Sequence, residues 1–168
     1  MHRDTEYTFD TINKLYPRDA LFVVERNQNT NTVVYRANLR SNGSVDPARP
    51  VVAEWVMFEK SRDGSVRDEL TTMEQKLAFG FKLTPLGNGQ YNMLVHALPS
   101  KPLRLFFDPH GRMRVGVQMA SGPAILHRIF IHVNKSKRLS IPSVEKAVAY
   151  GVSMSGKPVR QVLMKNDI

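Results

Sequence analysis

Short apolar runs separated by polar turns fill most of this chain, a pattern typical of an antiparallel β-sheet. The alternation is most regular from Met113 to Met119, where every second residue is apolar. Runs rich in β-branched and aromatic residues predict the other strands, at Leu21–Arg26, Thr32–Leu39, Val51–Phe58, Phe81–Leu86, Tyr91–Leu98, Leu103–Phe107, Ala124–Val133, Val144–Met154 and Pro158–Met164. We therefore expect a mainly β fold of about eight to ten antiparallel strands, arranged as a barrel or a strongly coiled sandwich.

Two segments have helical spacing instead. From Glu69 to Phe79 the apolar residues fall on one helical face, and Gly80 is placed to cap the end. Phe9–Leu15 makes a shorter apolar stripe that Pro17 closes. We predict one internal helix and one short N-terminal helix, with residues 1–19 forming a lid segment on a single β-rich domain of residues 20–165.

Composition excludes several kinds of chemistry. The 168 residues contain no cysteine, so disulfides, thiolate metal sites and cysteine nucleophiles are excluded. His127 and His132 lie five positions apart in a predicted strand, which places their side chains on opposite faces. No established catalytic motif is present, and we expect neither a metal nor a cofactor.

The N-terminus does not have the pattern of an export signal. Met1–Glu6 are polar, where a signal peptide requires a basic stretch followed by an apolar one. No run of about 18 apolar residues occurs anywhere in the chain. We predict an intracellular, cytoplasmic location without a membrane span.

The net charge of +9 lies entirely in the last two fifths of the chain. Residues 1–100 hold 12 Lys+Arg and 12 Asp+Glu, whereas residues 101–168 hold 12 and 3, giving 12 − 3 = +9. Such asymmetry favours an acidic partner, although a basic solvated surface explains it as well. The partner-binding candidates are five basic residues of this part, Arg112, Arg114, Lys135, Lys137 and Arg138.

A second set of candidates consists of charged residues within apolar segments, where burial is costly unless the charges are paired. Its members are Glu25, Arg26, Glu74 and Arg128, which we expect to lie around Trp55. We expect these groups to pair with each other in a structural network. The alternative is a barrel mouth in which they bind a polar ligand or act as acid and base.

Several strings of the chain resemble DUF4833, an uncharacterised family of unknown function. The resemblance is strongest in the first half, and it runs from about Ala20 to near the end. It rests on Leu21–Arg26, Asn29–Tyr35, Trp55, Glu69–Leu70, Glu74–Gly80, Pro102–Leu103 and His127–Ile131. The resemblance implies one domain with no assigned activity, cofactor or catalytic residue, and its matched polar residues add Asn29, Asn31 and Tyr35 to the ligand-site candidates.

Two functions from different classes fit these observations. The first is a non-enzymatic binding or assembly protein whose basic C-terminal half docks on an acidic protein surface, as a subunit of a larger complex. The second is a small-ligand-binding or hydrolytic barrel built around the polar candidates. Sequence-tolerant binding of nucleic acid through the basic residues is a further alternative, since phosphate contacts need no base recognition.

Overall fold

The computed structural model describes residues 19–27, 29–60, 65–71, 79–96, 98–134 and 143–164. These residues form one sheet of 11 strands and contain no helix. The strands are β1 (Ala20–Arg26), β2 (Asn29–Ala37), β3 (Val51–Val56), β4 (Arg67–Glu69), β5 (Phe81–Gly87), β6 (Gln90–Val95), β7 (Leu103–Phe107), β8 (Met113–Met119), β9 (Gly122–Asn134), β10 (Ser143–Ser153) and β11 (Pro158–Met164).

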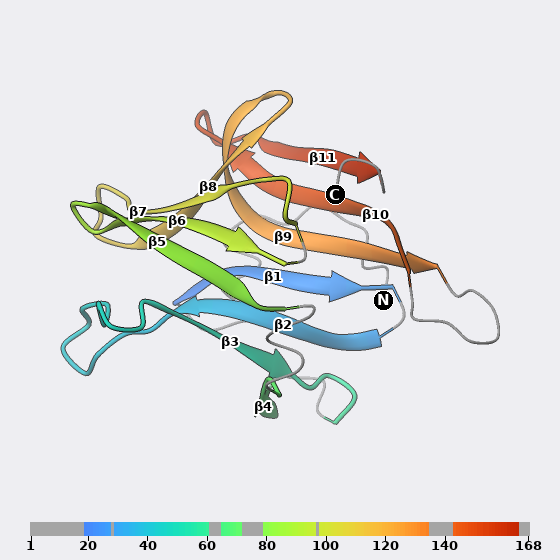
Figure 1. Cartoon of the computed structure of the whole chain (residues 1–168), viewed down its shortest axis with the longest axis horizontal. Helices are drawn as coiled ribbons and strands as arrows, with labels where there is room; N and C mark the ends of the chain where they lie inside the picture. The colour runs from blue at the N-terminus through green and yellow to red at the C-terminus, as the bar shows by residue number, and fades with distance from the viewer. Residues whose placement is uncertain are drawn as a thin grey trace.

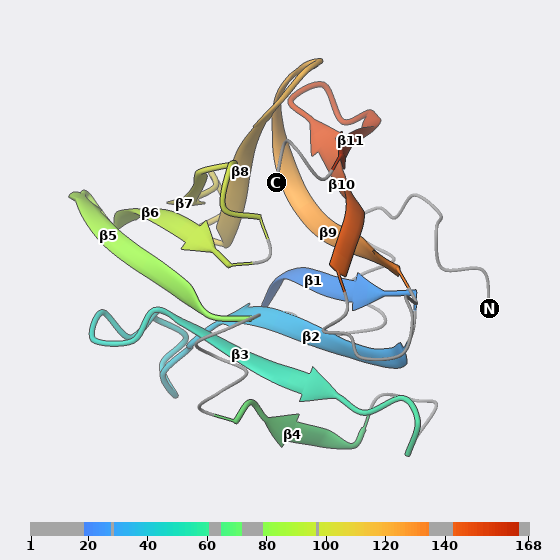
Figure 2. The same ribbon diagram turned by 45° about the vertical axis from the view of Figure 1, so that its right-hand side comes forward.

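The sheet curls into a half-barrel (Figure 1). Nine strands follow the order β4-β3-β2-β1-β9-β8-β7-β6-β5, and β10 and β11 continue from β9 outside this path. The long strand β9 pairs first with β8 and then with β1, so two wings of the sheet share it. Figure 2 shows the wings bending toward each other until β5 lies next to β3, at the open side of the half-barrel.

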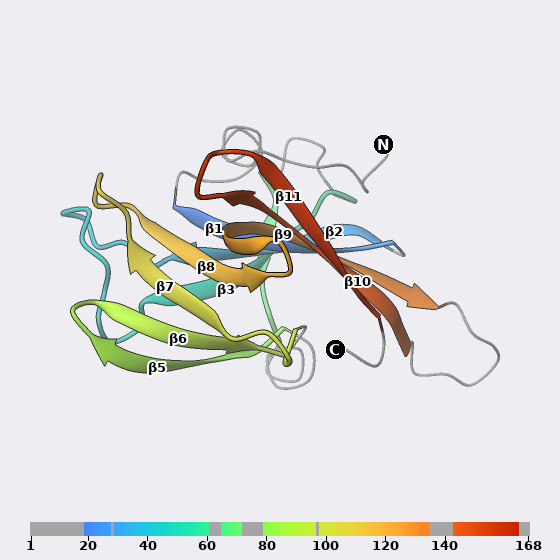
Figure 3. The same cartoon turned by 90° about the horizontal axis from the view of Figure 1, so that it is seen from above.

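A β-bulge bends the β9–β10 hairpin where the two wings meet. The pairing passes from Leu126 opposite Gly151 to Arg128 opposite Tyr150, so His127 is the extra residue. Gly151 allows the close approach here, because a Cβ at this position would lie 2.5 Å from the carbonyl oxygen of Ile125. The bend lets β10 and β11 cross the direction of β1 and β2 obliquely (Figure 3).

The main core fills the concave side of the sheet, because alternate residues of each strand point there. In β8 these are the four apolar residues of the predicted alternation, all buried. The convex side of β1, β2, β9 and β10 is buried as well, with Val23 and Val34 in one small cluster and Phe130, Val148 and Tyr150 in another. The strands at the centre of the sheet therefore have two buried faces.

The expectation of a purely antiparallel sheet is wrong for one pair of strands. β1 and β9 run parallel, with Val23 opposite Arg128 and Arg26 opposite Ile131. Asn27 extends the pairing, since its side chain donates to the Val133 carbonyl and accepts from the Val133 N–H. The mainly β class and the barrel-like curvature are confirmed, and the sheet is mixed.

The predicted internal helix does not begin where expected. Glu69 belongs to β4 and pairs with Glu54 of β3, and Leu70, Thr71 and Phe79 are not helical. Residues 72–78 of the predicted helix lie outside the described residues. The polar strand β4 is held through Arg67, whose guanidinium lies 2.9 Å from the Glu54 carboxylate. The predicted N-terminal helix and most of the predicted lid segment also lie outside the described residues. Within the described part, nothing forms a helix of the length and apolar character that crossing a bilayer requires.

Candidate functional site

Glu25 and Arg128 form an ion pair buried on the convex face of the sheet. The Arg128 Nε donates to Glu25 Oε1 at 2.6 Å, and the two side chains are 0% and 2% exposed. The guanidinium also lies over the rings of Tyr150 and Phe130, at 4.6 and 5.2 Å from their centroids. Burial on this scale makes the pair sensitive to the loss of either partner.

His127, the bulge residue, is also buried. Burial, and secondarily the neighbouring charge of Arg128, lower the pKa of His127 to about 4. The imidazole is therefore neutral at physiological pH. A charged His127 beside Arg128 would be repelled in the folded protein.

Arg26 and Tyr35 face the opposite, concave side. The Arg26 guanidinium lies 5.2 Å from the Trp55 ring centroid and 5.5 Å from that of Phe79. Tyr35 stacks on Phe22 at 4.5 Å, and its hydroxyl donates to the carbonyl oxygen of Phe79 at 2.8 Å. These contacts link β1, β2 and β3 to the segment that leads into β5.

The predicted polar candidates are thus divided between two faces of the sheet. Glu25 and Arg128 meet on the convex face, whereas Arg26, Tyr35 and Trp55 gather on the concave face. Asn31 is buried, and its side-chain oxygen accepts from the Glu59 N–H. The backbone of Asn29 pairs with Arg26, while its side chain and the whole of Glu74 lie outside what the structure describes. Among the described candidates, the two faces do not combine into one polar site.

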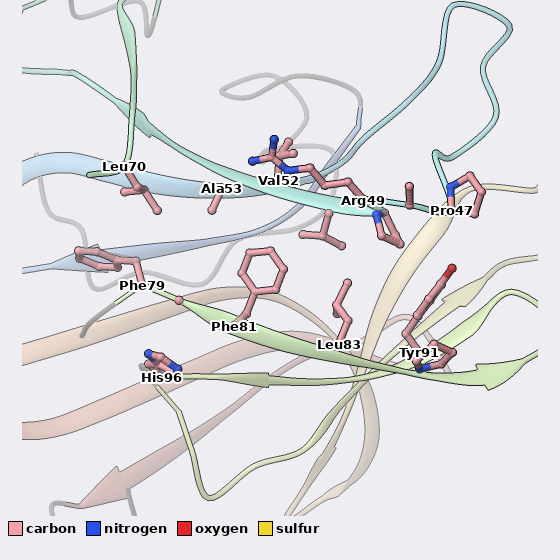
Figure 4. A pocket seen from close by; sticks show the side chains of 15 residues that line it. Pro47, Arg49, Val52, Ala53, Leu70, Phe79, Phe81, Leu83, Tyr91 and His96 are labelled. Carbon is pink, nitrogen blue, oxygen red and sulfur yellow. The ribbon is translucent and has the colours of Figure 1, made fainter. Parts of the chain in front are cut away.

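A cleft of ≈ 670 Å³ lies between β3 and β5, at the open side of the half-barrel. Phe81 and Leu83 of β5 point toward β3 in Figure 4, while Tyr91 lies near one end of the cleft and His96 near the other. Its described lining residues are mostly apolar, include Arg49 and contain no acidic residue. None of the described polar candidates lines this cleft.

The basic candidates that the structure describes are engaged in local structure. The Arg114 Nε lies 3.2 Å from Asp108 Oδ2, with both side chains about four-fifths or more buried at 16% and 15% exposure. The Arg112 N–H donates to the same carboxylate, within the turn between β7 and β8. Burial alone would raise the pKa of Asp108. The backbone N–H groups of Arg112 and His110, together with the hydrogen bond and charge of the Arg114 side chain, hold this pKa below its usual range. Lys135, Lys137 and Arg138 lie outside the described residues.

The most exposed apolar side chains of the described residues include three near the C-terminus. Val162 and Met164 are 43% and 52% exposed on the convex side of β11, and Met154 is 62% exposed in the turn before it. Arg160 is exposed between these positions, and Lys146 of β10 pairs with Met164. We call Lys146, Arg160, Val162 and Met164 the β11 face.

Comparison with known families shows to which family the chain belongs. The sequence model of the domain of unknown function DUF4833 matches residues 22–161. The chain belongs to the DUF4833 family. No curated protein and no solved structure matches it. For this DUF4833 domain the family therefore supplies a fold unit without an assigned activity, and its chemistry has to be argued from its own residues.

Two surfaces of this DUF4833 domain were not predicted from the sequence. The cleft follows from β5 being an edge strand, and Pro85 was the available signal, because proline within a strand is confined to edges and bulges. The β11 face was signalled by the alternation of Pro158–Met164, whose outward positions carry apolar side chains where a solvated strand carries polar ones. No group of three or more His, Asp or Glu side chains with metal-binding geometry occurs in the described part of the chain.

Proposed function

We propose that this protein is a non-enzymatic binding or assembly module that docks its β11 face on an acidic partner protein. The observation that carries the proposal is the exposure of Val162 and Met164 on an edge strand of the sheet. Exposed apolar side chains flanked by basic groups are typical of protein-binding surfaces, where methionine and arginine are enriched.

The apolar strip of the β11 face continues from buried neighbours. Val162 lies opposite Val148, which packs with Phe130 and Tyr150 in a convex cluster. The strip therefore begins in a packed layer and ends in solvent at β11. A partner that covers its exposed end extends an existing apolar layer, at about 25 cal/mol per Å² of apolar surface buried.

Charge supports an acidic partner. Residues 143–164 hold three basic residues, Lys146, Lys157 and Arg160, against Glu145, giving 3 − 1 = +2. Arg160 lies opposite Tyr150 and Lys146 opposite Met164, so both cations border the apolar strip. Complementary carboxylates on a partner would steer association and fix its orientation.

The test is a double charge reversal, Lys146→Glu with Arg160→Glu, in the full chain. A fluorescein-labelled polyglutamate peptide serves as the acidic probe, and its anisotropy is measured at low and high salt. We expect the probe to bind the wild type, to dissociate at high salt, and to bind the variant at least about fivefold more weakly. The matched control is Lys60→Glu with Arg104→Glu, two exposed cations elsewhere on the sheet and its loops.

Two results would contradict the proposal. Equal weakening by the control pair would indicate diffuse attraction to a basic protein without a docking face. Tighter binding of a DNA duplex of equal charge than of polyglutamate, with the same salt dependence, would favour the nucleic-acid alternative. A Val162→Ser variant separates the apolar contribution, which we expect to lower affinity with little change in the salt dependence.

A further inference from the structure

One edge of β5 has backbone groups that no described strand uses. Among the described strands β5 pairs with β6 alone, and the His96 N–H donates to the Gly80 carbonyl at 2.9 Å at the start of that pairing. Bonded residues alternate in an antiparallel pair, so Lys82 and Thr84 also bond to β6. The N–H and C=O groups of Phe81 and Leu83 therefore point the other way, toward the cleft.

The opposite wall of the cleft has the same property. The Asn38 N–H donates to the Pro50 carbonyl at 2.8 Å, so alternation makes Val52 and Glu54 the residues bonded to β2. Val51 then directs its backbone groups toward the cleft, whereas Ala53 faces Leu70 at the end of the β3–β4 register. β4 pairs with β3 only from Glu54 to Val56, and it does not reach Val51.

The described side chains around the cleft are apolar inside it and basic at its rim. Phe81 and Leu83 point inward and meet apolar groups, whereas Lys82, between them, is exposed on the outer face of β5. Arg49 and His96 add two exposed basic groups, and the described lining has no acidic residue. A strand laid along β5 would place alternate side chains inside the cleft and the others beside Lys82.

We propose that the cleft between β3 and β5 binds an extended peptide of a partner protein, with alternating apolar and acidic side chains, which pairs with β5 as an additional strand. The peptide would supply hydrogen bonds to Phe81 and Leu83 and fill the open side of the half-barrel. This site is separate from the β11 face, and it does not depend on the docking proposed there.

The test follows individual backbone amides of the full chain by hydrogen exchange in NMR spectra. The probe is a heptapeptide of alternating valine and glutamate. We expect saturating peptide to slow exchange at Phe81 and Leu83 by at least about tenfold. Lys82 and Thr84, which already bond to β6, provide the internal control and should change far less.

Three matched comparisons test the chemistry of the ligand. A heptapeptide of the same sequence with N-methylated backbone nitrogens keeps the side chains but cannot pair, and it should fail to protect either amide. Alternating valine and lysine should bind at least about tenfold more weakly than valine and glutamate. Lys82→Glu should reduce this preference, whereas Lys60→Glu, outside the cleft, should leave it unchanged.

Other outcomes would overturn the assignment. Protection of Phe81 and Leu83 without peptide, increasing with protein concentration, would identify a second copy of the chain as the occupant. Protection without peptide at all concentrations would mean that the chain itself covers the edge. Binding of the peptide with unchanged exchange at both amides, or equal binding of the N-methylated peptide, would exclude strand addition.

Discussion

Arg128 is fully buried, and its guanidinium contacts the Glu25 carboxylate and the rings of Tyr150 and Phe130. Removing a guanidinium from water costs several kcal/mol, and the attraction of Glu25 offsets that cost only while both partners are present. The pair is therefore weak evidence for high stability but strong evidence for dependence of each residue on the other. This dependence distinguishes the pair from the exposed ion pairs of the same molecule.

Glu25→Gln should lower the free energy of unfolding by about 3–5 kcal/mol, because it removes the carboxylate charge that the buried Arg128 guanidinium contacts. Urea unfolding measures the change. Asp46→Asn is the control, since Asp46 and Arg40 form a more exposed pair at 3.6 Å whose loss should cost at most about 1 kcal/mol. Replacing both buried charges, with Glu25→Leu and Arg128→Met, should recover most of the loss. Equal costs for Glu25→Gln and Asp46→Asn would show that burial of the pair is not energetically important.

His127 makes the stability depend on pH. Its pKa falls from 6.5 to about 4 on folding, so between these values the unfolded chain binds a proton that the folded chain does not. Its contribution is fully present above pH 6.5 and is lost as the pH falls toward 4. Between pH 7 and 5 the wild type should lose about 2 kcal/mol more than His127→Gln. Urea unfolding of both proteins at the two pH values checks this, and parallel losses would show that another group titrates.

Single strands show which elements the sequence could predict. The bounds of β7, β8 and β11 agree with the predicted ones, because each is a short run with clear alternation between turns. β4 was missed because Arg67, Asp68 and Glu69 have no apolar pattern, and only pairing with β3 makes them a strand. The same three-residue segment explains why Glu69 was wrongly assigned to a helix: tertiary pairing overrode its local propensity.

Gly151 limits what the β9–β10 hairpin accepts at its bend. Alanine at this position would place a Cβ 2.5 Å from the Ile125 carbonyl, so one of the two strands must move. We expect Gly151→Ala to destabilise the protein by about 1–3 kcal/mol, as overpacking does. Gly116→Ala is the control, because its Cβ would meet nothing closer than the Phe106 ring at 3.4 Å. Thermal and urea unfolding of both variants measure the two losses of stability. Equal stability of Gly151→Ala and Gly116→Ala would indicate that the bulge adapts without cost.

The arrangement of the whole molecule was less accessible from the sequence than its strands. β1 and β9 pair in parallel although Glu25 and Arg128 lie 103 positions apart, and no local pattern encodes such a pairing. The burial of Glu25 and Arg128 was predictable from their apolar surroundings, and strand alternation already places Glu25 and Arg26 on opposite faces. That Glu25 meets Arg128 depends on the pairing of β1 with β9. The cleft emerges only at this scale, because it lies between β3 and β5, two strands that do not pair with each other.

The Tyr35 hydroxyl of β2 makes a polar contact across the half-barrel, to the segment that leads into β5. Burial raises the pKa of Tyr35, so its hydroxyl stays protonated and donates to the Phe79 carbonyl. Tyr35→Phe keeps the stacking on Phe22 but removes this donor, and we expect a loss of about 1–3 kcal/mol. Amide exchange should accelerate along β5 more than along β8, because the hydrogen bond holds the segment leading into β5 against β2. Tyr91→Phe, which alters a half-buried ring of the cleft without a hydroxyl contact among the described residues, should leave both strands unchanged. Uniform acceleration in β5 and β8 would mean that the hydrogen bond stabilises the whole fold and not the closure of the half-barrel.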